Sequence, residues 1–392
     1  MTAAAAAGRL GIKQATLYAY VSRGVLTRAR AADGRGSLFD ADEVERLALR
    51  GRPRRPAGSA DITVESQITE LATDRLRFRG QDVVALAGSR SLEDVAELLW
   101  TGQLPAEPQP CWQASHTALT AGQAAQAALP DGILPLERFQ VIVPAMASTD
   151  PLRLQLDPAA VMAAGRGIAA GMVDCLPPQA ARTGLSVAAR LWSRLSDARP
   201  SPGLLRCMSA ALVLLADHEL AASTLAARAA ASVRADPYAV VATGLGALGG
   251  ALHGGSSLGA EALLASAHGS PAEVPRVVGE LLRRGERVPG FGHYVYKSGD
   301  PRAIALLDLV RRAAPKSAQL AVADAVLAEI RQKSLPEPNV DFALATLSRV
   351  ASMVTGAAEA IFAVARTTGW IAHALEAYTT APIRPRAVYT GP

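Results

Sequence analysis

VPGFGHYVYKSGDPR, at residues 288–302, places one histidine, three glycines and two cations within fifteen residues. The proline-glycine pair is typical of a helix end, and Gly292 presents His293 on a loop where backbone can approach a ligand. The alternative is a tight turn whose histidine only caps a neighbouring helix. The second proline predicts a new helix with Arg302 in its first turn. An arginine fork at the positive end of a helix suits a carboxylate, so we expect a binding site here.

The composition of the whole chain favours helices. The 392 residues are 50% hydrophobic but only 4% aromatic, so alanine, leucine and valine must build the core. Alanine at this density favours closely packed helices, and strand-like alternation of β-branched residues is scarce. We therefore expect an all-α fold of two or three domains.

No apolar run approaches the roughly 20 residues that span a bilayer. The run of alanines at residues 3–7 lacks the basic flank of a signal peptide, which favours a cytoplasmic location. The three cysteines are too widely spaced for a disulfide framework or a thiolate metal site. We expect no metal, and we expect small core residues at Cys111, Cys175 and Cys207.

The formal net charge of +5 belongs to the N-terminus. Residues 1–55 hold eleven Lys or Arg against five Asp or Glu, a balance of +6, which leaves about −1 for the rest. Residues 3–10 and 13–21 predict two short helices at helix-turn-helix spacing, and a basic, glycine-broken hairpin follows. Asp40 is expected to cap a third helix carrying Val44 and Leu47. The alternative is a small helical cap on the main domain.

Two histidines lie in the middle of the chain. The apolar pattern of residues 204–233 predicts one long helix containing Ala-Asp-His-Glu, and its His218 is more often a satisfied core residue than a ligand. Adjacent helix positions point in different directions, so these residues do not suit one metal ion. GLGALGGALHGGSSLG, at residues 244–259, lacks the ending of a phosphate loop. A helix starting near Ser257 would direct its dipole at His253 and hold that imidazole neutral.

The C-terminal third adds two charged candidates. Asp341, in Asn-Val-Asp-Phe, precedes an apolar helix and could simply be its N-cap. ARTTGWIAH, at residues 365–373, is an apolar helix interrupted by Arg366, which needs an anionic partner because an unpaired buried arginine is costly. Residues 106–200 carry no motif that we can name, so we expect them to be scaffold.

Taken together and in order, these motifs resemble the citrate synthase family from about residue 66 to the end of the chain. The matching segments are Asp-His-Glu, Leu-His-Gly-Gly, Gly-Phe-Gly-His with Asp-Pro-Arg nine residues after the histidine, Asn-Val-Asp-Phe, Ala-Arg-Thr-Thr-Gly-Trp, and Arg-Pro-Arg near the C-terminus. The N-terminal segment resembles the winged helix-turn-helix of the MerR and excisionase type. The resemblance implies a helix-turn-helix domain at residues 1–50, a linker at 51–65, a large helical domain at 66–255 and 347–392, and a small helical domain at 256–346.

The resemblance implies condensation of acetyl-CoA, or another short acyl-CoA, with oxaloacetate to give citrate and CoA, with no cofactor beyond the thioester substrate. It casts Asp341 as the base, His253 as the donor to the enol oxygen, and His293 as the donor to the ketone. The residues that would hold the two carboxylates of oxaloacetate are His218, Arg302, Arg366 and Arg384. Lys297 falls where the family places a cation for coenzyme A. Family members are homodimers, in which Arg384 would come from the partner subunit.

Two departures and two alternatives remain open. Tyr294 stands where many bacterial members have arginine, and the spacing after Arg366 is two residues short, which makes Arg386 a rival to Arg384. One alternative is a 2-methylcitrate synthase that uses propionyl-CoA. The other is a DNA-binding regulator whose synthase fold senses a ligand, although a sensor would need only the binding residues and would not need the base Asp341.

Overall fold

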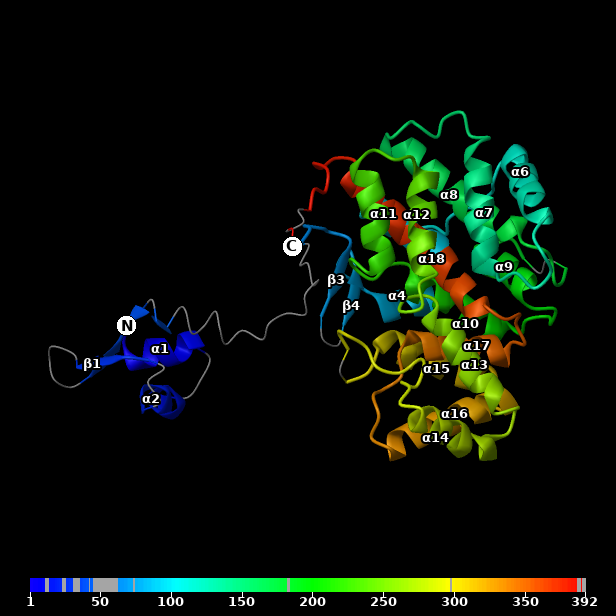
Figure 1. Cartoon of the computed structure of the whole chain (residues 1–392). Coiled ribbons are helices and arrows are strands. Elements are labelled where there is room, and N and C mark those ends of the chain that lie inside the picture. Colours follow the sequence, from blue (N-terminus) through cyan, green and yellow to red (C-terminus); the bar gives the residue numbers. More distant parts are fainter. Residues whose placement is uncertain are drawn as a thin grey trace. The chain divides into compact units, whose positions relative to one another are not determined.

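The structure, a computed structural model, describes residues 1–10, 14–22, 26–30, 36–41, 43–44, 63–72, 75–181, 184–296, 298–385 and 389. The chain divides into two compact units, Met1–Val64 and Glu65–Pro392 (Figure 1). Helices make up most of the larger unit, and the strands in the described part of the chain are only two or three residues long. The all-α prediction is therefore confirmed.

The first unit has the elements of the predicted helix-turn-helix and hairpin. They are α1 (Ala3–Leu10), α2 (Gln14–Ser22), β1 (Arg28–Arg30) and β2 (Ser37–Phe39). The two strands pair antiparallel, with Arg28 opposite Phe39. A small core gathers under them, and its members include Leu17, Leu26, Phe39 and Val44.

The third helix predicted for this unit lies only partly within the described residues. Asp40 accepts a hydrogen bond from the Glu43 backbone N–H at 3.1 Å, as an N-cap does. Val44 is fully buried. Leu47, which the sequence places one turn further on, lies outside the described residues.

The second unit opens with a small antiparallel sheet of β3 (Thr69–Leu71), β4 (Leu76–Phe78) and β5 (Gln81–Asp82). Arg79 and Gly80 form the tight turn between β4 and β5, both with positive φ, at 48° and 81°. Asp82 then caps the next helix, since its Oδ1 accepts from the Ala85 N–H at 2.9 Å. The helices that follow, up to residue 232, are α4 (Val83–Ser89), α5 (Leu92–Thr101), α6 (His116–Ala127), α7 (Pro135–Ala147), α8 (Pro158–Cys175), α9 (Val187–Leu195), α10 (Pro202–Leu215) and α11 (Ala222–Ser232).

The centre of this unit is α18 (Ala357–Ala377), a 21-residue helix that is buried over nearly its whole length. Helices α5, α8, α10, α11 and α12 (Pro237–Leu248) pack around it (Figure 1). A helix that is apolar all round is stable only when it is covered on every side, which this bundle provides. Gly244 lets α12 come close, because a Cβ there would lie 2.6 Å from the Trp370 ring.

A second group of helices follows the glycine-rich segment. It consists of α13 (Ser256–Ser266), the 3₁₀ turn η1 (Pro271–Glu273), α14 (Val274–Arg283), α15 (Pro301–Ala313), α16 (Ala318–Gln332) and α17 (Val340–Val350). Helix α17 packs on α13, α15 and α16, while α15 also packs on α10 of the first group. As predicted, α15 begins at the proline of Asp-Pro-Arg, with Asp300 as its N-cap.

The prediction of one continuous helix over residues 204–233 is wrong. Helix α10 ends at Leu215 and α11 begins at Ala222, and between them Glu219 has φ 54°. Asp217 provides the local hydrogen bond of the turn, accepting from the Glu219 N–H at 3.1 Å. The apolar periodicity continues across the break because α10 and α11 both pack on α18.

One of the three cysteine predictions is also wrong. Cys175 and Cys207 are buried, whereas Cys111 is exposed. Its neighbour Trp112, 3% exposed and stacked on Trp100, occupies the core position instead. In the described part of the chain, no helix has both the length and the apolar character that crossing a membrane requires.

Candidate functional site

Six of the predicted site residues line one cavity in the second unit, with a volume of about 390 Å³. They come from the turn after α10, the segment before α13, the loop before α15, the first turns of α15 and α17, and the middle of α18. The six are His218, His253, His293, Arg302, Asp341 and Arg366. The fold therefore brings together residues that span about 150 positions of sequence.

His253 lies just before α13 and is held from α11. Its Nε2 is 2.7 Å from the hydroxyl of Ser223, which is fully buried. The ring also meets the edge of Phe362, with centroids 5.7 Å apart. Burial, reinforced by the nearby Arg366 charge, lowers the pKa of His253 to about 4. The imidazole is therefore neutral at neutral pH, as predicted, but burial is the main cause.

His218 lies in the turn that interrupts the predicted long helix. Its Nε2 is 3.1 Å from the Tyr296 hydroxyl, and its ring contacts that of His293 edge-on at 5.4 Å between centroids. Burial, followed by the charges of Arg302 and Arg366, lowers the pKa of His218 well below its usual value. A second neutral imidazole therefore faces the cavity.

His293 holds its own loop. Its Nδ1 accepts hydrogen bonds from the backbone N–H groups of Val295 and Tyr296, at 3.0 and 3.3 Å. An accepting Nδ1 carries no proton in the neutral ring, so the proton is on Nε2. The ring stabilises its own loop and caps no neighbouring helix in the described part of the chain, contrary to the alternative interpretation, and it also lines the cavity with a defined tautomer.

Arg302 reaches the cavity with its charge already balanced. Its Nε and Nη2 donate to Asp300 Oδ1 and Oδ2 at 3.0 and 2.8 Å, in a bidentate pair that is 3% and 0% exposed. Asp300 Oδ2 also accepts from the Val340 N–H, which ties this pair to α17. Burial alone would lower the pKa of Arg302, but Asp300 raises it. We expected Arg302 to bind a carboxylate, and in the structure Asp300 supplies one.

Unlike Arg302, Arg366 has no carboxylate hydrogen-bonded to it among the described residues. It is 1% exposed, and its Nε donates to the Leu215 carbonyl at 2.8 Å. Neither Nη atom has a hydrogen-bond partner among the described residues. Burial lowers the pKa of Arg366 to about 10, with Asp217 opposing the shift. A buried, charged fork that faces a cavity without partners of its own can accept an anion.

Asp341 lies in the first turn of α17, whose N-cap is Asn339, so Asp341 is not the cap. Both of its oxygens are hydrogen-bonded, since Ser256 Oγ donates to Oδ2 at 2.5 Å and Ser257 Oγ donates to Oδ1 at 2.6 Å. Burial raises the pKa of Asp341, and the two hydroxyls oppose that shift. Each carboxylate oxygen has a second lone pair, so an oriented base remains able to take up a proton.

One predicted residue that the structure describes is not brought to this cavity. Arg384 is exposed in the C-terminal segment and is not among the described residues that line the cavity. Lys297 lies outside the described residues, as does the rival Arg386. A second cavity of about 660 Å³ adjoins the first and shares with it Arg287, Gly292, His293 and Tyr294.

Sequence reasoning missed the residues that hold the site in place. Ser256 and Ser257 follow the two glycines after His253 at the start of a predicted helix, but nothing in that segment indicates that they meet Asp341. Ser223 and Tyr296 gave no signal either. The pairing of Asp300 with Arg302 could have been found, because an N-cap aspartate and an arginine two residues later share the first turn. The arrangement can bind a small polyanion beside neutral donors and a carboxylate base.

Comparison with known proteins identifies relatives over most of the chain. Residues 59–386 match the model of the citrate synthase C-terminal domain, and residues 1–51 match that of MerR helix-turn-helix regulatory proteins. Citrate synthase 2 of Bacillus subtilis is 30% identical over 365 residues, covering 84% of this chain and 94% of that protein. Citrate synthase of Haloferax volcanii is 32% identical, with the same two coverages. A 2-methylcitrate synthase of Mycobacterium tuberculosis is 30% identical, covering 87% and 91%.

The fold is shared with solved structures. The ternary complex of a Thermoplasma acidophilum citrate synthase with carboxymethyl coenzyme A and oxaloacetate matches with a TM-score of 0.71 at 25% identity, over 85% of this chain and 95% of that one. The Pyrobaculum aerophilum citrate synthase also gives 0.71, at 24% identity, over 93% and 95%.

Proposed function

Because the chain belongs to the citrate synthase family, we propose that this condensing acyltransferase joins a short acyl-CoA, acetyl-CoA first of all, to oxaloacetate and releases citrate and CoA. One observation carries the choice of a dicarboxylate: the guanidinium of Arg366 is buried at 1% exposure, and neither of its Nη atoms has a partner among the described residues. Two neutral histidines and the paired Arg302 line the same cavity.

The first step in this proposal is removal of a proton from the carbon next to the thioester. Asp341 takes the proton, and its raised pKa makes it a stronger base than an exposed aspartate. His253 donates to the thioester oxygen as the enol forms. Ser223 can donate to Nε2 of His253, which places the proton on Nδ1 for that bond. A neutral donor suits an enol, because it stabilises the developing negative charge on oxygen.

The second step forms the carbon–carbon bond. The enol carbon attacks the ketone carbon of oxaloacetate, and the enol O–H proton returns to His253 as the thioester carbonyl re-forms. The ketone oxygen takes the Nε2 proton of His293, which solvent then replaces. His218, Arg302 and Arg366 hold the two carboxylates and so orient the ketone. Water then attacks the thioester carbonyl, the carbon–sulfur bond breaks, and CoA leaves as the thiol. We propose each residue's role in these reaction steps from its position in the family motifs, and the geometry of the cavity supports it.

We assign the neighbouring cavity of about 660 Å³ to the coenzyme. It adjoins the first at His293, which would place a thioester next to the ketone, and the exposed Arg287 at the shared wall can meet phosphate. Lys297, which follows in the same loop, is the second cation we propose for CoA phosphates.

Thiol release tests this function. Purified protein is mixed with oxaloacetate and, in turn, acetyl-CoA, propionyl-CoA and butyryl-CoA, while the CoA thiol is followed with a colorimetric reagent. We expect release that requires both substrates. A kcat/KM that is highest for propionyl-CoA would make the protein a 2-methylcitrate synthase. Oxaloacetate binding without thiol release from any acyl-CoA would favour the ligand-sensor alternative.

We propose that the enzyme works as a homodimer in which Arg384 completes the partner's site. Two points support this. Arg384 is exposed, and the resemblance to the family casts it as a residue of the partner subunit that holds a carboxylate of oxaloacetate. Two inactive variants, Arg384→Ala and Asp341→Asn, should regain activity when their subunits exchange, because one site of the mixed dimer is then intact. An active monomer, or no recovery after proven exchange, would refute the shared site. Residues 256–346 would form the mobile small domain that closes over the substrates.

We further propose that residues 1–50 bind duplex DNA. This segment belongs to a compact unit of its own and matches the MerR model. Gln14 and Thr16 are exposed at the start of α2, where groove contacts are usually made, and Arg28 is exposed on the hairpin. Two such modules on a dimer would bind more tightly than one.

Fluorescence anisotropy with labelled duplex DNA tests this second proposal. Affinity should fall with salt at a logarithmic slope of about −0.9 for each phosphate neutralised. Deleting residues 1–60 should abolish binding but leave thiol release intact. Binding that is undetectable at low salt, or unchanged by the deletion, would make the segment a structural or partner-docking module.

A further inference from the structure

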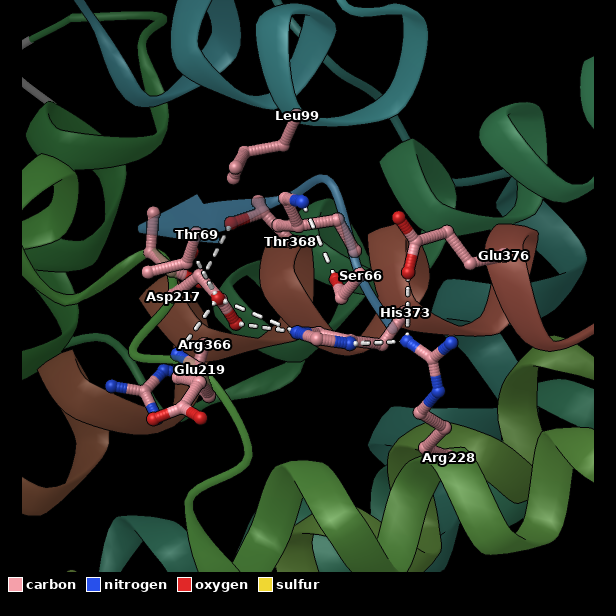
Figure 2. Close-up of polar contacts among 12 residues, drawn as sticks. Ser66, Thr69, Leu99, Asp217, Glu219, Arg228, Arg366, Thr368, His373 and Glu376 are labelled. Atoms are coloured by element: carbon pink, nitrogen blue, oxygen red, sulfur yellow. Dashed lines mark hydrogen bonds and ion pairs between the residues drawn. The ribbon is translucent and has the colours of Figure 1, made fainter. Parts of the chain in front are cut away.

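A chain of polar side chains, buried except for the partly exposed Glu376, runs from the turn beside His218 to the first residues of the second unit. Figure 2 shows its members, Asp217, His373, Arg228 and Glu376. His373 Nε2 is 3.4 Å from the Asp217 carboxylate, and Arg228 Nη1 donates to His373 Nδ1 at 2.9 Å. The same nitrogen donates to Glu376 Oε2 at 2.8 Å. In the described part of the chain, none of the four lines the substrate cavity.

This chain fixes the state of His373. An arginine only donates hydrogen bonds, so Nδ1 of His373 must accept and its proton is on Nε2. That N–H therefore points to Asp217. From the other side, the Thr69 hydroxyl of β3 donates to Asp217 Oδ2 at 2.5 Å. Although burial opposes it, the interactions with His373 and Thr69 and the nearby charge of Arg366 lower the pKa of Asp217, so a fully buried carboxylate stays ionised.

The turn that holds Asp217 is also attached directly to α18. Leu215 accepts from Arg366 Nε at 2.8 Å, and Ala216 accepts from the Thr368 hydroxyl at 3.4 Å. Gly369 makes this contact possible, because a Cβ there would lie 2.4 Å from the Ala216 carbonyl oxygen and 2.5 Å from Asp217 Oδ1. His218 is the next residue after this contact. A shift of the turn therefore moves His218 and loosens Arg366 together.

We propose that Asp217 is a positioning residue for oxaloacetate, which it does not touch: it fixes the turn bearing His218 against α18 and balances the Arg366 charge from outside the cavity. This inference rests on the proposed function. The contrast with Arg302 supports it, because Asp300 uses two nitrogens of that guanidinium. Asp217 makes no hydrogen bond to Arg366 in the described structure, so it supplies charge while the Nη atoms face the cavity.

The test compares Asp217→Asn with a matched control. Asp174→Asn removes a similarly buried carboxylate, paired with Arg190 away from this cavity. In Asp217→Asn we expect the KM for oxaloacetate to rise roughly 10- to 100-fold, the range for hydrogen bonds to a charged group. The KM for acyl-CoA at saturating oxaloacetate should change less than about threefold. Asp174→Asn should lower thermal stability to a similar degree and leave both KM values near those of the parent.

Two substitutions at His373 test the same role if Asp217→Asn does not fold. Glutamine can donate to Asp217 and accept from Arg228, whereas alanine can do neither. His373→Ala should therefore raise the oxaloacetate KM, and His373→Gln should restore most of it. Equal effects on both substrates, no recovery in His373→Gln, or parental oxaloacetate affinity in a folded Asp217→Asn would overturn the positioning role. A parent that neither binds oxaloacetate by calorimetry nor releases thiol would instead overturn the proposed function.

Discussion

The two ends of the proposed substrate cavity contain one buried arginine each, and the two arginines differ in the partners that balance their charge. At the α15 end, Arg302 is held by the carboxylate of Asp300 through two hydrogen bonds. At the α18 end, Arg366 has only the Leu215 carbonyl as a hydrogen-bond partner among the described residues. Two buried guanidinium nitrogens without partners cost stability, which favours a role for Arg366 other than packing. We therefore expect an anion to bind at the α18 end of the cavity.

The largest effect should come from removing that charge. Arg366→Met should lower kcat/KM for oxaloacetate about 10²- to 10⁴-fold, because two hydrogen bonds to a charged group are lost at once. Arg366→Lys should recover little, since a single ammonium cannot replace a planar fork. Steady-state kinetics with oxaloacetate as the varied substrate measure both variants. An oxaloacetate KM close to that of the parent would show that the fork does not bind the substrate.

For stability we expect the reverse order: replacing Arg302 should lower the unfolding free energy more than replacing Arg366. Arg302→Met leaves Asp300 buried without its cation, which should cost about 3–5 kcal/mol of unfolding free energy. Arg366→Met removes two unmatched donors together with the single bond to the Leu215 carbonyl, so it should cost less unfolding free energy than Arg302→Met. Urea denaturation of both variants decides this. If Arg366→Met is the less stable of the two, the difference between the two ends is not one of charge balance.

The sequence predicted the charged residues of the cavity better than the turn and the partners that hold them, and the reason is physical. An arginine inside an apolar helix such as ARTTGWIAH has few ways to be satisfied, so Arg366 was expected to need an anion. His218 was placed on a continuous helix, because apolar periodicity reports which faces are buried and is insensitive to a six-residue turn between two helices on the same core. The partners Ser256 and Ser257 reach Asp341 from 84 and 85 residues away. Contacts at that separation depend on tertiary packing, which no local pattern encodes.

A smaller effect is expected from His253, the proposed donor to the thioester oxygen, which lines the same cavity. His253→Ala should lower kcat on the order of 10²- to 10³-fold, as the loss of one oxyanion donor does. The oxaloacetate KM should change much less, because His253 is assigned to the thioester. Asp341→Asn should be at least as damaging, while Ser256→Ala should cost less, since Ser257 still orients the carboxylate. Full activity of His253→Ala would remove it from the mechanism.

The smallest effect concerns pH, and it follows from Arg366 lying near His253. Because burial and the Arg366 charge lower the pKa of His253 to about 4, the unfolded chain binds a proton that the folded chain does not between that value and about 6.5. Stability therefore falls as the pH drops through this window. At pH 5 the loss from His253 should reach at most about 2 kcal/mol relative to pH 7, and solvent at this half-buried ring reduces it.

Urea denaturation at the two pH values measures this loss. His253→Gln should shrink the difference between pH 7 and pH 5, whereas His116→Gln, at an exposed position, should leave it unchanged. Arg366→Met should shrink it by less than His253→Gln does, because burial is the main cause of the low pKa of His253 and remains after the charge is removed. A difference that is the same in the parent and His253→Gln would mean that this imidazole is not held neutral by the fold. A difference that Arg366→Met removes completely would mean that charge outweighs burial at this end of the cavity.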